Sequence, residues 1–138
     1  MRARTRPRWL RRPTARDKDR GQASVELAVL ALVVLALTFT AIQVGLYYHA
    51  RKVAQSAARQ GVEAGRAFGA GPSDGVAQAE RFLARFGGSV RGASVSAGGS
   101  TAQQLRITVS GRVATLVPGL DLDVVQHADG PVERWTTP

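Results

Sequence analysis

One apolar run, residues 27–42, constrains this chain more than any other feature. It reads LAVLALVVLALTFTAI and carries no charge; its polar side-chain groups are the hydroxyls of Thr38 and Thr40. In a helix, these hydroxyls can donate hydrogen bonds to backbone carbonyls one turn back. Continued to Tyr48, the segment would form a helix about 33 Å long, close to the thickness of a bilayer core. A chain of 138 residues has little else with which to bury such a helix, so the run predicts a membrane span rather than a buried core helix.

Positive charge is concentrated just before this run. Residues 1–20 contain nine basic and two acidic side chains, a net charge of +7, whereas residues 21–138 carry the remaining +2 of the total of +9. Because basic residues stay on the cytoplasmic side of a membrane, this asymmetry predicts a cytoplasmic N-terminus and an extracytoplasmic C-terminal part. Tyr47 and Tyr48 are expected in the aromatic belt where the helix leaves the bilayer.

The sequence lacks the residues on which many enzymes depend. It has no cysteine, two histidines, and none of the HExxH, GxSxG, GxxxxGK[ST] or GxGxxG motifs. We therefore expect no catalytic residue, no cofactor and no small-molecule substrate. Asp121, Asp123 and Asp129 lack the spacing of an EF-hand loop, so no metal site is expected, and His127 is expected to be exposed at the end of a strand.

The basic arm at residues 1–20 leaves two other interpretations open. An arm that binds nucleic acid would persist in the mature protein and bind in a salt-dependent manner, but arginines beside an apolar run favour a membrane, and nucleic acid is not an expected partner. A cleaved secretory signal would also begin with basic residues. Here, however, the apolar stretch is longer than a usual signal and no clear A-x-A site follows it.

Glu26, at the start of the apolar run, needs an explanation because a carboxylate near hydrocarbon is costly and often functional. One explanation places it in the headgroup region, where the N-terminal end of a helix dipole favours an anion. The other considers the preceding residues, since the basic arm ends at Gly21 and four residues separate this glycine from Glu26. Glycine has a permissive backbone, which suits an extended segment entering a protease cleft.

This arrangement resembles the class III leader peptide of type IV pilins and pseudopilins, which a prepilin peptidase cleaves after the glycine. The resemblance implies cleavage between Gly21 and Gln22. It further implies that the Glu26 carboxylate pairs with the new Gln22 ammonium of a neighbouring subunit, because each charge would otherwise be uncompensated in an apolar bundle.

Beyond the run, an alanine-rich segment at residues 49–68 should continue the helix as a rod. Val53, Ala57, Gly61 and Ala64 form a stripe of small residues that suits either packing on the chain's own domain or a contact with another subunit. Together the two segments resemble the TadE-like family of minor pseudopilins in tight-adherence pilus assembly. The residues that carry this resemblance are Arg20, Gly21, Val25 and Glu26, followed by Ala57, Ala58, Arg59, Gly61 and Ala64.

The sequence departs from the family pattern at three positions. Leu27 stands where the family usually has an aromatic residue, Leu32 where it has a proline, and Gln43 where it often has an acidic residue. The missing proline predicts a straighter helix.

The family resemblance implies a single-pass protein of the cytoplasmic (inner) membrane. Its expected partners are a prepilin peptidase, other pilin or pseudopilin subunits, inner-membrane assembly proteins and the lipid bilayer. Its expected role is assembly of a Flp-type pilus or a related secretion apparatus. The protein could itself be incorporated into the pilus. The alternative is a signal-anchored extracytoplasmic binding protein that is not processed at Gly21.

The C-terminal part, residues 69–138, is expected to form a small α+β domain. Val76, Ala79, Phe82, Leu83 and Phe86 recur on one face of a helix that Ser73 or Asp74 caps and that ends at Gly87. About three antiparallel strands should follow, at residues 90–97, at 105–117 with a bulge at Gly111, and at 122–125 before a turn at 129–131. The predicted organisation is a leader at 1–21, a transmembrane helix at 22–48, a helical rod at 49–68 and this domain.

Overall fold

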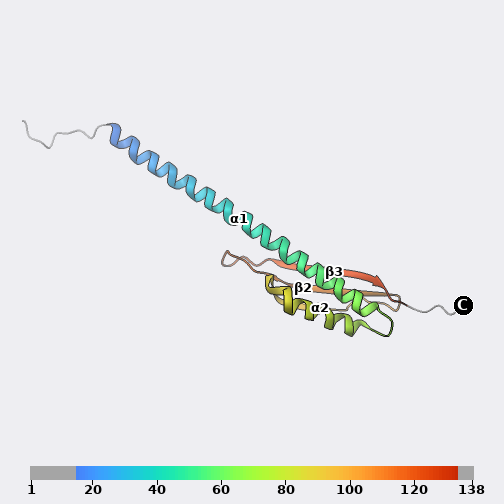
Figure 1. Cartoon of the computed structure of the whole chain (residues 1–138). Helices are drawn as coiled ribbons and strands as arrows, with labels where there is room; N and C mark the ends of the chain where they lie inside the picture. The colour runs from blue at the N-terminus through green and yellow to red at the C-terminus, as the bar shows by residue number, and fades with distance from the viewer. Residues whose placement is uncertain (1–14, 134–138) are drawn as a thin grey trace, which may run out of the picture. The chain divides into compact units, whose positions relative to one another are not determined.

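The computed structural model describes residues 15–133, with side chains from residue 21 onward, so most of the basic arm lies outside the described residues (Figure 1). The described residues form a long N-terminal helix followed by one shorter helix and three strands, which confirms the α+β class. The elements are α1 (Ala15–Arg66), α2 (Pro72–Phe86), a 3-10 turn (Gly87–Ser89), β1 (Val90–Ser96), β2 (Gln104–Val113) and β3 (Asp123–Pro131).

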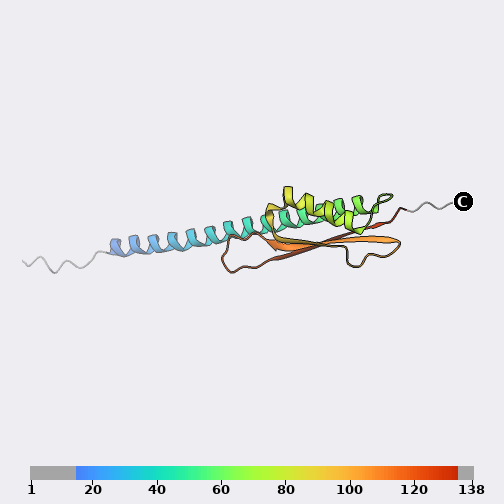
Figure 2. The same cartoon turned by 90° about the horizontal axis from the view of Figure 1, so that it is seen from below.

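The chain divides into two compact units, with the boundary between Thr38 and Phe39. We call Phe39–Pro138 the C-terminal unit; it contains the second part of α1, together with α2 and the sheet. The strands form an antiparallel meander in the order β1-β2-β3. Within this unit, the second part of α1 and α2 both cover one face of the sheet, giving a two-layer structure (Figure 2).

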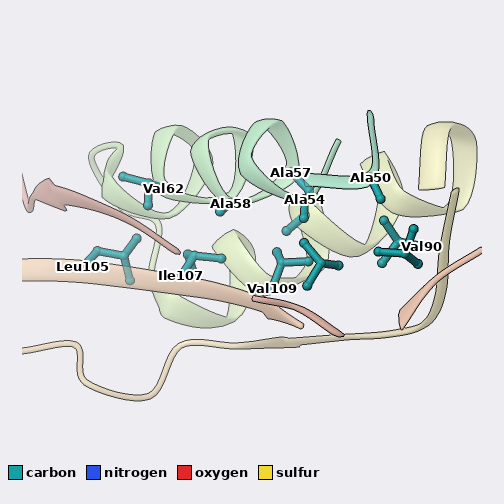
Figure 3. Packing of buried hydrophobic residues seen from close by; sticks show 12 residues of the cluster. Ala50, Ala54, Ala57, Ala58, Val62, Val90, Leu105, Ile107 and Val109 are labelled. Carbon is teal, nitrogen blue, oxygen red and sulfur yellow. The ribbon is translucent and has the colours of Figure 1, made fainter. Parts of the chain in front are cut away.

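The core of the C-terminal unit lies between the two helices and the sheet (Figure 3). On β2, Leu105, Ile107 and Val109 are buried, whereas the alternate residues between them are partly exposed on the other face, as the alternation in the sequence predicts. From α1, the buried apolar side chains are Ala50, Ala54, Ala57, Ala58 and Val62. These side chains are small, which allows α1 to approach the sheet and α2 closely.

The two helices approach each other closely at two glycines, Gly61 on α1 and Gly75 on α2. A Cβ on Gly61 would lie 2.8 Å from the carbonyl oxygen of Gly75, and a Cβ on Gly75 would lie 2.7 Å from the carbonyl oxygen of Gly61. Since real Cβ atoms are not found this close to backbone oxygens, both positions need glycine. The small-residue stripe therefore packs on the chain's own domain, one of the two alternatives that the sequence leaves open.

Helix α2 begins differently from the prediction. Its N-cap is Gly71 rather than Ser73 or Asp74, with Pro72 in the first turn. Asp74 lies three residues into the helix, where its carboxylate Oδ2 accepts a hydrogen bond from the Gly71 N–H at 2.8 Å. Its charge still stabilises the N-terminal end, but from inside the first turn. The predicted end at Gly87 is confirmed.

The strand boundaries also correct the prediction. Gly111 is not a bulge, because it pairs with Val124 in regular register; a Cβ there would lie 2.6 Å from a methyl group of Val90. The irregularity lies in β1 between Arg91 and Ser94, and contains Gly92 with a φ of +58°. Strand β2 ends at Val113 rather than at residue 117.

Strand β3 is longer than predicted. It runs through residues 129–131, expected as a turn, because Gly130 pairs with Leu105 and faces Val62 of α1, where a Cβ would come within 2.5 Å of a methyl group. His127 is exposed as predicted but lies in the middle of this strand rather than at its end.

The exposed face of the sheet carries an ion pair between Arg106 of β2 and Asp129 of β3, 2.6 Å apart. The hydrogen bond from Arg106, together with its positive charge, lowers the pKa of Asp129 below its ordinary value of 3.8, although partial burial opposes this shift. A carboxyl with a lowered folded pKa contributes stability above its ordinary pKa and loses it as the pH falls through the lower folded value.

We therefore expect Asp129→Asn to lower stability at neutral pH and to lose less stability on acidification than the unchanged chain. The effect should be small because both side chains are partly exposed. Urea unfolding at neutral pH and at a pH below the folded pKa measures it. An identical loss of stability on acidification in both proteins would contradict this assignment.

Candidate membrane anchor and processing site

The N-terminal part of α1 presents apolar side chains in every direction around the helix. From Val25 to Leu37 the large apolar residues are 49–68% exposed, and none of the most apolar stretch is buried within the structure. Consecutive residues in a helix are about 100° apart, so positions 32, 33, 34 and 35 alone point to all sides. Such a helix is apolar all round without being a core helix.

Within the described residues, one helix is long and apolar enough to cross a membrane, and it lies near the N-terminus. The hydroxyl of Thr38 donates to the carbonyl oxygen of Val34 at 2.8 Å, which confirms that this polar group is satisfied inside the helix. The segment can therefore lie in lipid without an unpaired hydroxyl at this position.

The predicted processing residues, Gly21, Gln22 and Glu26, all lie in α1 and are exposed. A Cβ on Gly21 would meet nothing within 4 Å, so neither packing nor a positive φ requires a glycine here. Gln22 and Glu26 are four residues apart and so share one face of the helix. Since a protease binds its substrate in an extended form, cleavage after Gly21 requires the first turns of α1 to unwind.

Two of the predicted motif residues, Arg20 and Ala64, differ from the others in how the structure describes or buries them. Arg20 lies in α1, but its side chain is outside the described residues. Ala64 is half-buried, whereas Ala57 and Ala58 are fully buried in the core of the C-terminal unit. Arg59 is exposed.

The two halves of the motif thus lie in different compact units and have different environments. Gly21, Val25 and Glu26 are exposed residues of the unit Met1–Thr38, whereas the second half of the motif belongs to the C-terminal unit. Ala57, Ala58 and Gly61 share the packed side of α1. The first half has no packing role in the described fold, whereas the second half holds α1 against its own domain.

Gln43 has a structural role that the sequence alone did not reveal. Its side chain is 7% exposed, and its Oε1 accepts a hydrogen bond from the N–H of Leu116, in the β2–β3 connection, at 3.0 Å. Its Nε2 is buried and has no hydrogen-bond acceptor among the described residues. The available signal was the single amide at the end of an apolar run, but sequence cannot tell which backbone group it meets.

Tyr47 and Tyr48 point to different environments. Tyr47 is partly buried against the core cluster, whereas Tyr48 is 57% exposed, and their rings meet edge to face with centroids 6.1 Å apart. Of this pair, only Tyr48 is therefore available to the predicted aromatic belt.

Next to Tyr48, the C-terminal unit has a shallow basic depression of about 360 Å³. It is lined by Tyr48, Arg51, Lys52, Gln55, Arg59 and Gln126. The amide Nε2 of Gln55 donates to the carbonyl oxygen of His127 at 3.2 Å, which ties α1 to β3 at this depression. Within residues 21–133, no three histidine, aspartate or glutamate side chains gather to hold a metal ion.

The family model described as "TadE-like protein" matches residues 21–63 of this chain. No curated protein and no solved structure matches the chain. The matched segment begins at Gly21 and includes Glu26, the apolar run and Ala57 to Gly61; Arg20 and Ala64 lie just outside it. TadE-like proteins are pilus-associated structural proteins, and the candidate membrane helix near the N-terminus of this chain fits a membrane-anchored protein. The match confirms the resemblance found in the sequence, and the segment at residues 21–63 is TadE-like.

Proposed function

We propose that this chain is a TadE-like minor pseudopilin, cleaved by a prepilin peptidase between Gly21 and Gln22 and acting in assembly of a Flp-type pilus or a related secretion apparatus. The observation that carries the proposal is the family match, which begins at Gly21 and runs through Glu26 and the whole apolar run. The exposed apolar surface of α1 on all sides supports a segment that lies first in lipid and then among other apolar helices.

In this proposal the cytoplasmic membrane holds the precursor, with the basic arm inside and the C-terminal unit outside. Removal of residues 1–21 would take away the arm that fixes the helix in the bilayer and would leave Glu26 near a free amine. The proposed partners are the peptidase, other pilin or pseudopilin subunits and inner-membrane assembly proteins. The chain carries a folded C-terminal unit in addition to its apolar helix, whereas a major pilin of this type consists of little more than the helix. This difference favours a minor component.

Protein isolated from its own host membranes should begin at Gln22, as N-terminal sequencing or intact mass would show. Gly21→Ala is expected to leave most of the protein as uncleaved precursor, because the peptidase must accept the residue before the scissile bond. A Cβ at Gly21 meets nothing within 4 Å, so a processing defect would not reflect misfolding.

Gly45→Ala is the matched control, because it makes the same change on α1 where a Cβ also meets nothing within 4 Å. This variant should be processed normally. A chain that still begins with Met1 in its host would contradict the proposal and support the alternative, a signal-anchored extracytoplasmic binding protein.

A further inference from the structure

The connection between β2 and β3, residues 114–122, is an ordered loop with its own hydrogen bonds. At its base, the N–H of Val113 donates to the carbonyl oxygen of Leu122 at 2.8 Å. At its tip, the N–H of Leu120 donates to the carbonyl oxygen of Val117 at 3.3 Å. Gly119 has a φ of +81° and follows Pro118, the arrangement of a type II turn. We call residues 114–122 the proline loop.

The proline loop exposes apolar side chains where loops usually expose polar ones. Leu116 is 50% exposed, Val117 44% and Leu120 36%. The chain therefore leaves these side chains only partly covered, although the turn that presents them is well formed. Clustered exposed apolar residues on an ordered loop indicate a contact with something outside the chain.

The location of the proline loop indicates what it contacts. The hydrogen bond from the N–H of Leu116 to Gln43 places the loop beside α1 at the point where the apolar run ends. Within the C-terminal unit, the loop lies at the opposite end from the turn that joins α1 to α2 (Figure 1, Figure 2). At this end α1 enters the unit with Phe39 and Ile42, which are 44% and 45% exposed.

We propose that the proline loop inserts Leu116, Val117 and Leu120 into the headgroup and upper acyl region of the leaflet through which α1 leaves the bilayer. This inference rests on the proposed membrane-spanning role of α1. If α1 is in hydrocarbon up to Ile42, the loop that covers Gln43 lies at the same depth, because one residue of helix rises only about 1.5 Å. The chain would then contact the membrane at two points, which restrains the C-terminal unit at the membrane surface.

The polar residues around the proline loop fit this depth. Arg112 and Asp121 flank the loop on the sheet side, both largely exposed and 4.0 Å apart, so they can remain in water while the tip enters lipid. A second protein copy is a poorer occupant, because a stable interface buries about 800 Å² per partner and three side chains at a turn tip cannot supply that area alone.

The absence of cysteine allows a direct test with single-cysteine variants of the full chain. Leu116→Cys, labelled with the environment-sensitive fluorophore NBD, is reconstituted into vesicles of phosphatidylcholine and phosphatidylglycerol. Ala102→Cys is the matched control, an exposed position in the β1–β2 connection at the other end of β2. Val33→Cys, within the apolar run, reports whether α1 itself is inserted.

We expect the label at residue 116 to lose most of its emission when the vesicles contain lipids with a doxyl quencher, and to resist iodide in the water. The label at residue 102 should show the reverse. Equal iodide quenching at residues 116 and 102 would overturn the proposal. A label at 116 that neither quencher reaches would also overturn it, because it would show that the loop is covered by protein, either the same chain or a second copy. Quenching by lipid at residue 33 but not at 116 refutes the loop insertion alone, whereas no quenching at 33 refutes the membrane anchor.

Discussion

Gly61→Ala is expected to lower the free energy of unfolding of the C-terminal unit by about 1–3 kcal/mol, the usual cost of overpacking a tight contact. The new Cβ would lie 2.8 Å from the Gly75 carbonyl oxygen and 3.1 Å from both the Ala79 Cβ and a methyl group of Ile107. The nearest of these atoms belongs to the backbone of α2, which cannot rotate away as a side chain can. Alanine gains at most about 1 kcal/mol of helix propensity over glycine, so the clash should dominate.

The full chain is unfolded with urea in detergent micelles, and unfolding is monitored by the hydrogen-exchange protection of the β2 amides. These amides report the C-terminal unit without the signal of the membrane segment. Gly45→Ala is the matched control, because its Cβ meets nothing within 4 Å. It should leave stability unchanged or raise it by up to about 1 kcal/mol. Similar losses in Gly61→Ala and Gly45→Ala would contradict the close helix contact.

Gly75→Ala should destabilise the unit for the same reason, since its Cβ would lie 2.7 Å from the Gly61 carbonyl oxygen. Either alanine must push α1 and α2 apart, and once they are apart the second substitution costs less. We therefore expect the double variant to lose less stability than the sum of the single variants. Simple additivity would indicate two independent strains instead of one shared contact.

The sequence predicted the elements whose pattern depends on burial alone. The alternation on β2 and the helical spacing of Val76, Ala79, Phe82 and Leu83 on α2 match the structure, because each element has one face covered by the core. Phe86, predicted on the same face of the helix, is 57% exposed, because α2 ends there. The sequence also indicated that the stripe of small residues on α1 would pack closely. It could not show that Gly75 is the partner of Gly61, because that pairing depends on how two helices cross over the sheet.

Two of the errors occurred where a residue type common in turns has a packing role instead. Gly111 and Gly130 are strand residues because an approaching methyl group leaves no room for a Cβ, and local sequence carries no information about that methyl group. Similarly, Gln43 reads as a polar interruption of the apolar run, whereas the structure uses it to hold the backbone of a loop 73 positions away. Long-range contacts of this kind require the fold to be known.

Glu26→Gln is expected to abolish incorporation into the pilus or secretion assembly while leaving cleavage after Gly21 and membrane insertion intact. The amide has nearly the shape of the carboxylate but cannot neutralise a free ammonium, so the Gln22 amine of a neighbouring subunit would remain uncompensated in an apolar bundle. Co-purification with other subunits and recovery in sheared surface fractions measure incorporation. N-terminal sequencing of the same sample verifies cleavage.

Glu63→Gln is the control for this substitution, because it makes the same change on an exposed residue of α1 whose carboxylate pairs with Arg66 at 2.9 Å. It should be incorporated normally. Normal incorporation of Glu26→Gln would contradict the proposed charge pairing, and loss of cleavage would assign Glu26 to recognition by the peptidase instead.

The geometry of α1 also allows pairing within one chain, because Gln22 and Glu26 are one helical turn apart on the same face. Co-expression of Glu26→Gln with the unchanged chain separates the two arrangements. If pairing is between subunits, the variant still offers its own Gln22 amine to an unchanged Glu26, so mixed assemblies should contain some of it. If pairing is within a chain, each variant subunit lacks its own counter-charge, and it should be excluded from the assembly whatever its neighbours are.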